Sequence, residues 1–219
     1  MRMAHGSERP GPAYIDVDEM REHPRPHRYV HGGFEETHTR FSFYFPPVAQ
    51  YRGRFVQHLE GGSGGHENMI EFQPWLYGVA FEDLGAYLVE SNQGHFPNEG
   101  MGFADDWELF GASARCALYA KELAAEMYGA APDHGYVFGG SGGGSRSIYC
   151  LENRPDVYDG ASPHVIWSSP LGSNWSPIGC WWLHARHKLP QIVQPMEPGG
   201  SGDPFALLTV GGREGPAAL

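Results

Sequence analysis

The chain has 219 residues, of which 41% are hydrophobic and 13% aromatic. This composition can form one hydrophobic core and is too apolar for a disordered chain. Lys and Arg number 15 against 26 Asp and Glu, so the formal net charge of −11 excludes the basic surface of a nucleic-acid-binding protein. No apolar run approaches the roughly 18 residues that cross a bilayer. We therefore expect neither a nucleic-acid nor a membrane partner.

The N-terminal half predicts strands before any long helix. The runs that we expect to be strands cover residues 28–30, 40–45, 54–59 and 86–90. The second run is rich in aromatic residues and ends at Pro46 and Pro47. A weakly helical stretch over 75–84 separates the third run from the fourth. An opening of three strands without a helix indicates an antiparallel start to a sheet.

Strands and helices alternate from residue 105 onward. Asp105 or Asp106 offers an N-cap for a long helix that stops at Gly129. The apolar stripe of this helix has helical spacing and comprises Ala114, Ala117, Ala120, Ala124, Met127 and Tyr128. The later elements that we expect are a strand over 135–138, a helix over 145–153 and a strand over 160–167. This alternation predicts an α/β fold, with a mostly parallel sheet and helices on both faces.

The periodic pattern decays after Ser168. A group of tryptophans, Trp175, Trp181 and Trp182, predicts a short helix or cap. Nearby, His184 and His187 are spaced to share one helical face, but no third ligand of suitable spacing accompanies them, so we predict no metal site. We assign residues 1–194 to a single, partial domain and residues 195–219 to a poorly ordered Gly- and Pro-rich tail.

The three cysteines, Cys116, Cys150 and Cys180, lie far apart and form no C-x-x-C pair. They indicate free thiols in a reducing compartment, with neither a disulfide framework nor a zinc site. The N-terminal residues contain no apolar h-region of a secretory signal. Both features predict a cytoplasmic location.

One glycine cluster fits the pattern G-x-S-x-G over residues 139–143, with Ser141 at its centre. A strand precedes it and a helix follows, which is the context of a nucleophile elbow. There Ser141 would be the catalytic nucleophile, and the Gly142 N–H would bind an oxyanion at the start of the helix. The alternative is a flexible linker, which the flanking runs YVF and SRSIYCLENRP disfavour.

Two phosphate-binding motifs fail at the same cluster. A P-loop needs G-K-[ST] after its glycines, where this chain has Ser145 and Arg146. A dinucleotide fingerprint lacks either its last glycine or an acidic residue at a convincing distance. We therefore predict no cofactor.

A second glycine cluster over 61–65 follows the strand at 54–59. Serine hydrolases of this type take their other oxyanion donor from such a loop, which makes the N–H of Gly61 or Gly62 a candidate. A tight turn without catalytic role remains an equal alternative for any single glycine. Beside these loops, His66 and His95 are candidate pocket residues.

The segment YVFGGSGGGSRSIYCLENRPDVYDGASP resembles the elbow region of α/β-hydrolases of the tannase and feruloyl-esterase type, and AYLVESNQGH is similar to their strand and loop after the first helix. The resemblance covers roughly residues 28 to 170. It implies hydrolysis of a small-molecule ester through an acyl-enzyme on Ser141. That family commonly has a cysteine before the serine, bridged to one beside the catalytic histidine, whereas this chain has Gly140.

The rest of a catalytic triad is not identified. In this fold the acid and then the histidine follow the serine. The histidines after Ser141 are His164, His184 and His187, and the acids between are Glu152, Asp156 and Asp159, all near the elbow helix and its exit. We therefore expect a C-terminally truncated hydrolase of weak activity. The alternative is a non-catalytic fragment or binding module that retains the pocket.

Overall fold

The computed structural model describes residues 11–99, 102–166, 183 and 186–207. The chain divides into two compact units, Met1–Trp167 and Ser168–Leu219, which are described separately. This division differs from the predicted domain boundary after residue 194. The predicted tryptophan group, Cys180 and His184 lie outside the described residues, as do residues 208–219 of the predicted tail.

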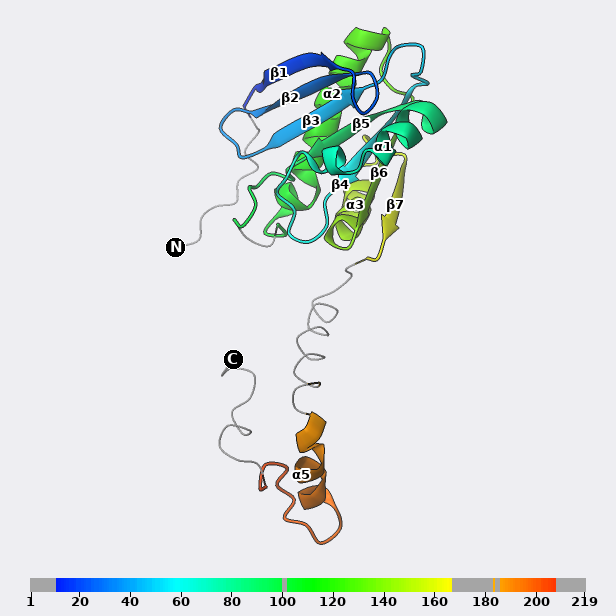
Figure 1. Cartoon of the computed structure of the whole chain (residues 1–219). Helices are drawn as coiled ribbons and strands as arrows, with labels where there is room; N and C mark the ends of the chain where they lie inside the picture. Colours follow the sequence, from blue (N-terminus) through cyan, green and yellow to red (C-terminus); the bar gives the residue numbers. More distant parts are fainter. Residues whose placement is uncertain (1–10, 100–101, 167–182, 184–185, 208–219) are drawn as a thin grey trace. The chain divides into compact units, whose positions relative to one another are not determined.

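The first unit is built on a sheet of seven described strands (Figure 1). Their bounds are β1 Ala13–Arg21, β2 His27–Phe34, β3 Arg40–Phe45, β4 Arg54–Leu59, β5 Ala86–Ser91, β6 His134–Gly140 and β7 Gly160–His164. The strand order is β1-β2-β3-β5-β4-β6-β7. Antiparallel pairing joins β1, β2, β3 and β5, and parallel pairing joins β5, β4, β6 and β7. The α/β class and the antiparallel start are confirmed, within a sheet that is mixed.

The strand β1 was not predicted from the sequence. Its segment AYIDVDEMR alternates acidic and apolar residues, and none of its side chains is fully buried. An edge strand with both faces partly in water gives a weak pattern, because burial on one face is what produces a clear alternation. β1 therefore extends the antiparallel part of the sheet beyond the predicted strands.

The helical segments of the first unit are η1 Met69–Phe72, α1 Trp75–Tyr77, η2 Gly78–Leu84, η3 Trp107–Gly111, α2 Ala112–Tyr128 and α3 Gly142–Asn153. The predicted helix over 75–84 is confirmed as α1 and η2. α3 begins at Gly142, directly after Ser141 and three residues before the predicted start. β7 ends at His164, short of the predicted residue 167.

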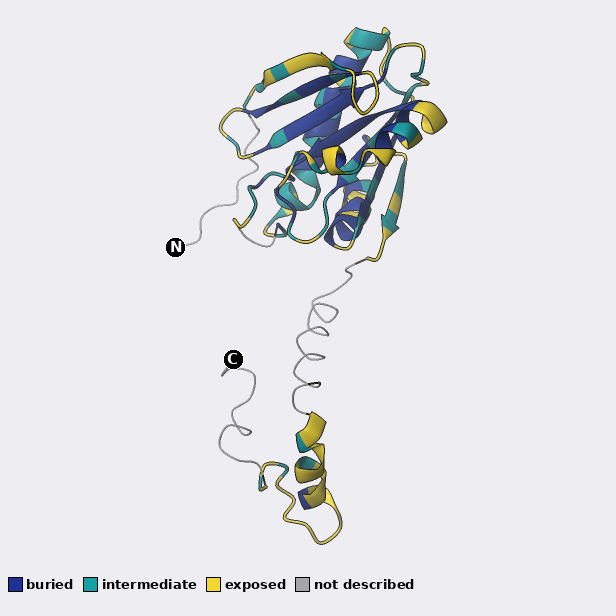
Figure 2. Ribbon diagram, viewed as in Figure 1, coloured by how far each residue is buried: buried dark blue, intermediate teal, exposed yellow. Residues whose placement is uncertain are grey.

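The sheet has a hydrophobic cluster on each face, and its central strands are largely buried (Figure 2). On one face, Phe41, Phe43 and Phe45 pack with residues of α2 and α3. On the other, Tyr44 packs with residues of η1, α1 and η2. Because successive side chains of a strand point to opposite faces, β3 contributes to both cores. The helices therefore cover both faces, as predicted.

The alanine stripe of α2 lets this helix approach the sheet closely. Ala114, Ala117, Ala120 and Ala124 are all fully buried. At the N-terminal side of the helix, Asp105 accepts a hydrogen bond from the Glu108 N–H at 3.0 Å, which satisfies one of the donors without a helical partner. At the other end, Gly129 has φ +83°, the left-handed conformation that commonly ends a helix at glycine. Both predicted ends are thus explained.

Described elements of the second unit are short. They are η4 Arg186–Lys188, α5 Leu189–Val193 and η5 Gln194–Met196. Within the described residues of both units, no helix combines the length and apolarity that a bilayer crossing requires. The candidate site lies in the first unit.

Replacing Phe43 by alanine should destabilise the first unit strongly. The ring is fully buried and stacks on Phe41 with ring centroids 4.4 Å apart. Phe→Ala at such a position costs about 3–5 kcal/mol of unfolding free energy. Urea denaturation followed by circular dichroism measures the loss. Phe72→Ala is the control, because Phe72 is 71% exposed and a change there should stay within about 0.5 kcal/mol. Equal losses in the two variants would contradict this description of the core.

Candidate active site

Ser141 occupies a sharp turn between β6 and α3. β6 ends at Gly140 and α3 begins at Gly142, and Ser141 between them has φ +55° and ψ −118°. A residue other than glycine rarely adopts positive φ, and such strain persists only where neighbouring contacts hold it. The Ser141 N–H donates to the His164 carbonyl of β7 at 3.0 Å, and the Ser141 carbonyl accepts from the Ser145 N–H at 3.1 Å. The serine side chain itself is exposed.

The glycine loop over residues 61–65 lies against this turn. It follows β4, the strand that pairs with β6. A Cβ at Gly61 would lie 3.0 Å from the Gly140 carbonyl oxygen and 3.8 Å from the Ser141 Cβ. A Cβ at Gly142 would collide with the Gly62 carbonyl oxygen. Glycine at these positions therefore allows the two backbones to meet.

Three backbone N–H groups beside Ser141 are without acceptors. Among the described residues, the N–H groups of Gly61, Gly62 and Gly142 donate no hydrogen bond. Gly142 opens α3, and the first N–H groups of a helix have no partner one turn earlier. These groups also form the positive end of the helix dipole. The turn thus combines an exposed hydroxyl with unpaired donors on neighbouring segments.

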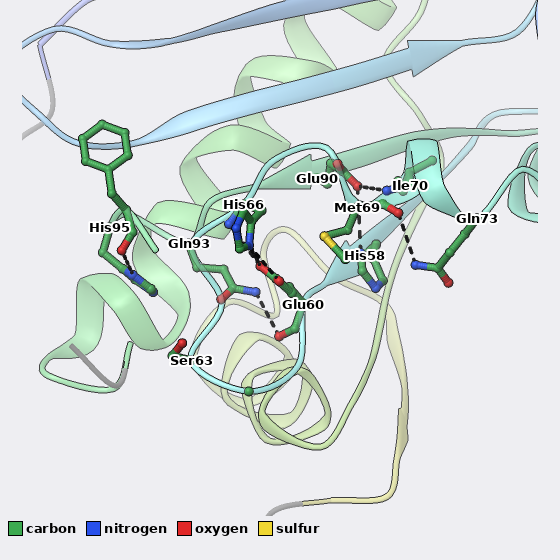
Figure 3. Close-up of polar contacts among 12 residues, drawn as sticks. His58, Glu60, Ser63, His66, Met69, Ile70, Gln73, Glu90, Gln93 and His95 are labelled. Carbon is green, nitrogen blue, oxygen red and sulfur yellow. Dashed lines mark hydrogen bonds and ion pairs between the residues drawn. The ribbon is translucent and has the colours of Figure 1, made fainter. Parts of the chain in front are cut away.

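Glu60 joins the two ends of the glycine loop (Figure 3). Its carboxylate accepts from the His66 backbone N–H at 3.0 Å and lies 2.9 Å from His66 Nδ1. The Glu60 carbonyl accepts from the Gln93 side-chain amide at 3.3 Å. These contacts attach both ends of the loop to each other and to the segment after β5.

The two predicted pocket histidines have different surroundings. His66 is exposed and pairs with Glu60. His95 is buried, its Nδ1 lies 3.1 Å from the Phe96 carbonyl, and its Nε2 has no partner among the described residues. Neither ring hydrogen-bonds to Ser141 in the described structure. Their assignment to a pocket stays a prediction.

His164 is the described histidine that lies next to the turn. A Cβ at Gly140 would approach its Nε2 to 2.7 Å. Of the other histidines after Ser141 in the sequence, His187 is in η4 of the second unit, and His184 is outside the described residues. The structure therefore places His164 beside the residue that precedes Ser141.

The acids between Ser141 and these histidines lie away from the turn. Asp156 pairs with Arg154 at 2.7 Å, and Asp159 accepts from the Gly135 N–H at 2.7 Å. Both precede β7, at the N-terminal edge of the parallel strands, whereas Ser141 follows the C-terminal end of β6. Glu152 is at the C-terminal end of α3 and is exposed. The described structure brings none of the three to Ser141.

A His–Glu pair on adjacent strands, with the histidine mostly buried and the glutamate fully buried, was not predicted from the sequence. His58 of β4 is opposite Glu90 of β5, and His58 Nδ1 lies 3.9 Å from Glu90 Oε2. That oxygen also accepts from the Ile70 N–H at 2.9 Å (Figure 3). Burial raises the pKa of Glu90 well above its usual range, whereas burial and the charge of His164 lower the pKa of His58 to about 4. The signal in the sequence was a carboxylate within the otherwise apolar run AYLVE.

Arg146 of α3 is the other important residue that the motif analysis did not assign. It is fully buried and contacts carbonyl groups of the glycine loop.

Cys116 and Cys150 are free thiols, both buried. Among the described residues, no group of three or more His, Cys, Asp or Glu side chains is arranged to hold a metal ion.

The strand order, the turn at Ser141 and the helices on both faces define an α/β-hydrolase-like fold. Two solved structures from Aspergillus oryzae support this class, an esterase at 14% identity and feruloyl esterase B at 20%. Each has a TM-score of 0.51 and is matched over 68% of this chain and 34% of its own.

Sequence comparison shows a resemblance to the same class of esterases. No family model matches the chain. A probable feruloyl esterase B-1 from Aspergillus oryzae is 30% identical over 117 residues, which cover 51% of this chain and 21% of the relative. The chain therefore spans about a fifth of the length of this curated relative. The predicted resemblance to feruloyl-esterase-type α/β-hydrolases is confirmed.

His58 should make stability fall with acid. Its folded-state pKa of about 4 is below the unfolded value of about 6.5. At pH 4 the unfolded imidazole is almost fully protonated and the folded one only about half, and the integrated difference from pH 7 costs about 3 kcal/mol of unfolding free energy. Urea denaturation at both pH values should show this extra loss in the wild type relative to His58→Gln. His134→Gln, at an exposed position of β6, is the control. A wild-type loss equal to that of His58→Gln would contradict the prediction.

Proposed function

We propose that this chain carries the nucleophile-bearing part of a serine hydrolase that cleaves a small-molecule carboxylic ester through an acyl-enzyme on Ser141. One observation carries the proposal, namely the positive-φ turn of Ser141 between β6 and α3 with the glycine loop against it. Strained backbone at an exposed serine is the arrangement of a nucleophile elbow. The resemblance to esterases supports the same reaction class.

In the proposed reaction, Ser141 Oγ attacks the ester carbonyl carbon as its proton passes to a base. The carbonyl oxygen becomes an oxyanion that accepts hydrogen bonds from the Gly142 N–H and from the N–H of Gly61 or Gly62. Collapse of the intermediate releases the alcohol, which takes up a proton, and leaves the acyl group on Ser141. Water then attacks the acyl carbon and releases the carboxylic acid. The unpaired donors beside the turn support these assignments.

We expect the first step to be slow in this chain. Asp156 and Asp159 lie at the far edge of the parallel strands, so the described residues of the first unit place no acid–histidine pair of the expected order beside the serine. Hydrolases that lose a triad member keep roughly 10³–10⁴-fold catalysis over water through the oxyanion hole and binding. Ester turnover at that residual level is therefore the expected activity.

A fluorophosphonate probe tests the nucleophile, because its phosphorus is attacked by an activated serine and the fluoride leaves. We expect slow covalent labelling of the folded wild-type chain, with the added mass on the peptide that contains Ser141. Ser141→Ala should abolish the labelling, measured by intact-protein and peptide mass spectrometry.

Ser162→Ala is the matched control, because Ser162 is an exposed serine on β7 and its loss should leave labelling unchanged. Absence of labelling in a folded wild-type chain would instead favour a binding module without turnover. Labelling that persists in Ser141→Ala would contradict the assignment of the nucleophile.

A further inference from the structure

Arg146 is a fully buried arginine that binds backbone carbonyls instead of a carboxylate. Its guanidinium donates to the carbonyl oxygens of Glu60 at 3.4 Å, Gly62 at 3.3 Å and Ser63 at 2.7 Å. A fourth bond goes to the carbonyl of Gly102 at 2.5 Å. Three of these four acceptors belong to the glycine loop or to the residue immediately before it.

The guanidinium keeps its charge in this environment. Its four hydrogen-bond acceptors among the described residues are carbonyl oxygens, and the charges of Glu108 and Glu60 also favour the protonated form. Burial lowers the pKa of Arg146 to about 10, which still leaves the side chain protonated at neutral pH. The ring of Phe103 covers the guanidinium at 4.0 Å from carbon to centroid, a favourable cation–π contact.

Burying an arginine without an ion-pair partner is costly. A core position would be filled at lower cost by an apolar side chain of similar volume. The residue therefore has a role that depends on the donors of Nη1 and Nη2, which the planar guanidinium holds in a fixed arrangement. Its acceptors identify that role, because they are concentrated on the loop beside Ser141.

The direction of these hydrogen bonds sets the direction of the loop N–H groups. In a planar trans peptide, the carbonyl and the N–H of the following residue point to opposite sides. When Arg146 holds the Glu60 carbonyl, the Gly61 N–H is turned away from the guanidinium. The Gly62 carbonyl orients the Ser63 N–H in the same manner. Gly102 also lies against the loop and Arg146. A Cβ at this position would collide with the Ser63 carbonyl oxygen and with the Arg146 guanidinium.

We propose that Arg146 is a positioning residue for the glycine loop, which it turns so that the Gly61 N–H faces the oxyanion of the Ser141 reaction. The inference rests on the proposed function for its catalytic consequence. Arg146 touches no reacting atom and acts through the loop. Its contacts with the loop exist independently of any reaction, so they can be tested separately.

Amide hydrogen exchange in the full chain tests the effect on the loop. Arg146→Met keeps the bulk of the side chain and removes all its hydrogen-bond donors. We expect exchange of the peptide spanning residues 60–66 to become at least about tenfold faster, because amides exchange faster when local structure opens more readily. Arg154→Met is the matched control. Arg154 is the C-cap residue of the same helix and pairs with Asp156. This variant should therefore leave the loop unchanged.

The rate of fluorophosphonate labelling tests the catalytic consequence. Loss of one oxyanion donor lowers the rate of acyl transfer by roughly 10²–10³-fold, so misdirection of the loop should lower the maximal labelling rate about tenfold to hundredfold. The probe concentration for half-maximal rate should change little, because Arg146 touches no reacting atom. Arg146→Lys should fall between wild type and Arg146→Met, since an ammonium retains the charge but not the planar fork.

The outcomes separate the two proposals. Unchanged exchange over residues 60–66 in a folded Arg146→Met chain overturns the role of Arg146, whatever the labelling result. If the wild type is not labelled while exchange rises as expected, the proposed function fails and the control of the loop by Arg146 stands. If Arg146→Met does not fold, the same comparison is made with Arg146→Lys. Exchange and labelling at wild-type rates in that variant overturn the proposal.

Discussion

The candidate site depends on one close approach of two backbones. The loop after β4 and the turn after β6 meet where Gly61, Gly62 and Gly142 carry no side chains, and a Cβ at Gly142 would collide with the Gly62 carbonyl. Parallel pairing of β4 with β6 brings the two segments to the same edge of the sheet. Without this contact the unpaired N–H groups of Gly61 and Gly62 would lie apart from that of Gly142, and the turn at Ser141 would be held only by its hydrogen bonds to His164 and Ser145.

The polar groups around this contact share a structural task. Arg146 binds carbonyls of the loop, Glu60 connects its ends through His66, and Glu90 accepts from the Ile70 N–H just after it. A polar group removed from water is expensive unless it is hydrogen-bonded. Arg146 meets this requirement at Nη1 and Nη2, although its Nε has no partner among the described residues, and Glu60 and Glu90 accept from backbone N–H groups. The loop is thereby fixed in one conformation.

Sequence patterns predicted those elements of the fold in which the residue types show which side chains are buried. The aromatic residues of β3 are buried on both faces of the sheet, and the alanines of α2 are buried against one face. The strand was predicted from its aromatic content and the helix from the spacing of its alanines. β1 was not predicted, because residues on both of its faces are partly in water. The turn at Ser141 was predicted because its glycines and flanking segments form a local motif, whose constraints operate within a few residues.

By itself, the sequence determined the α/β class, Ser141 as the candidate nucleophile and the resemblance to feruloyl-esterase-type hydrolases. Only the tertiary structure decided that Gly61 and Gly62 lie against Gly142, that His164 is beside Gly140, and that Arg146 binds the loop. The contacts between the glycine loop and α3 join residues that are about 80 positions apart in the chain. Spacing along the chain carries no information about such pairs, because strand order and register bring them together.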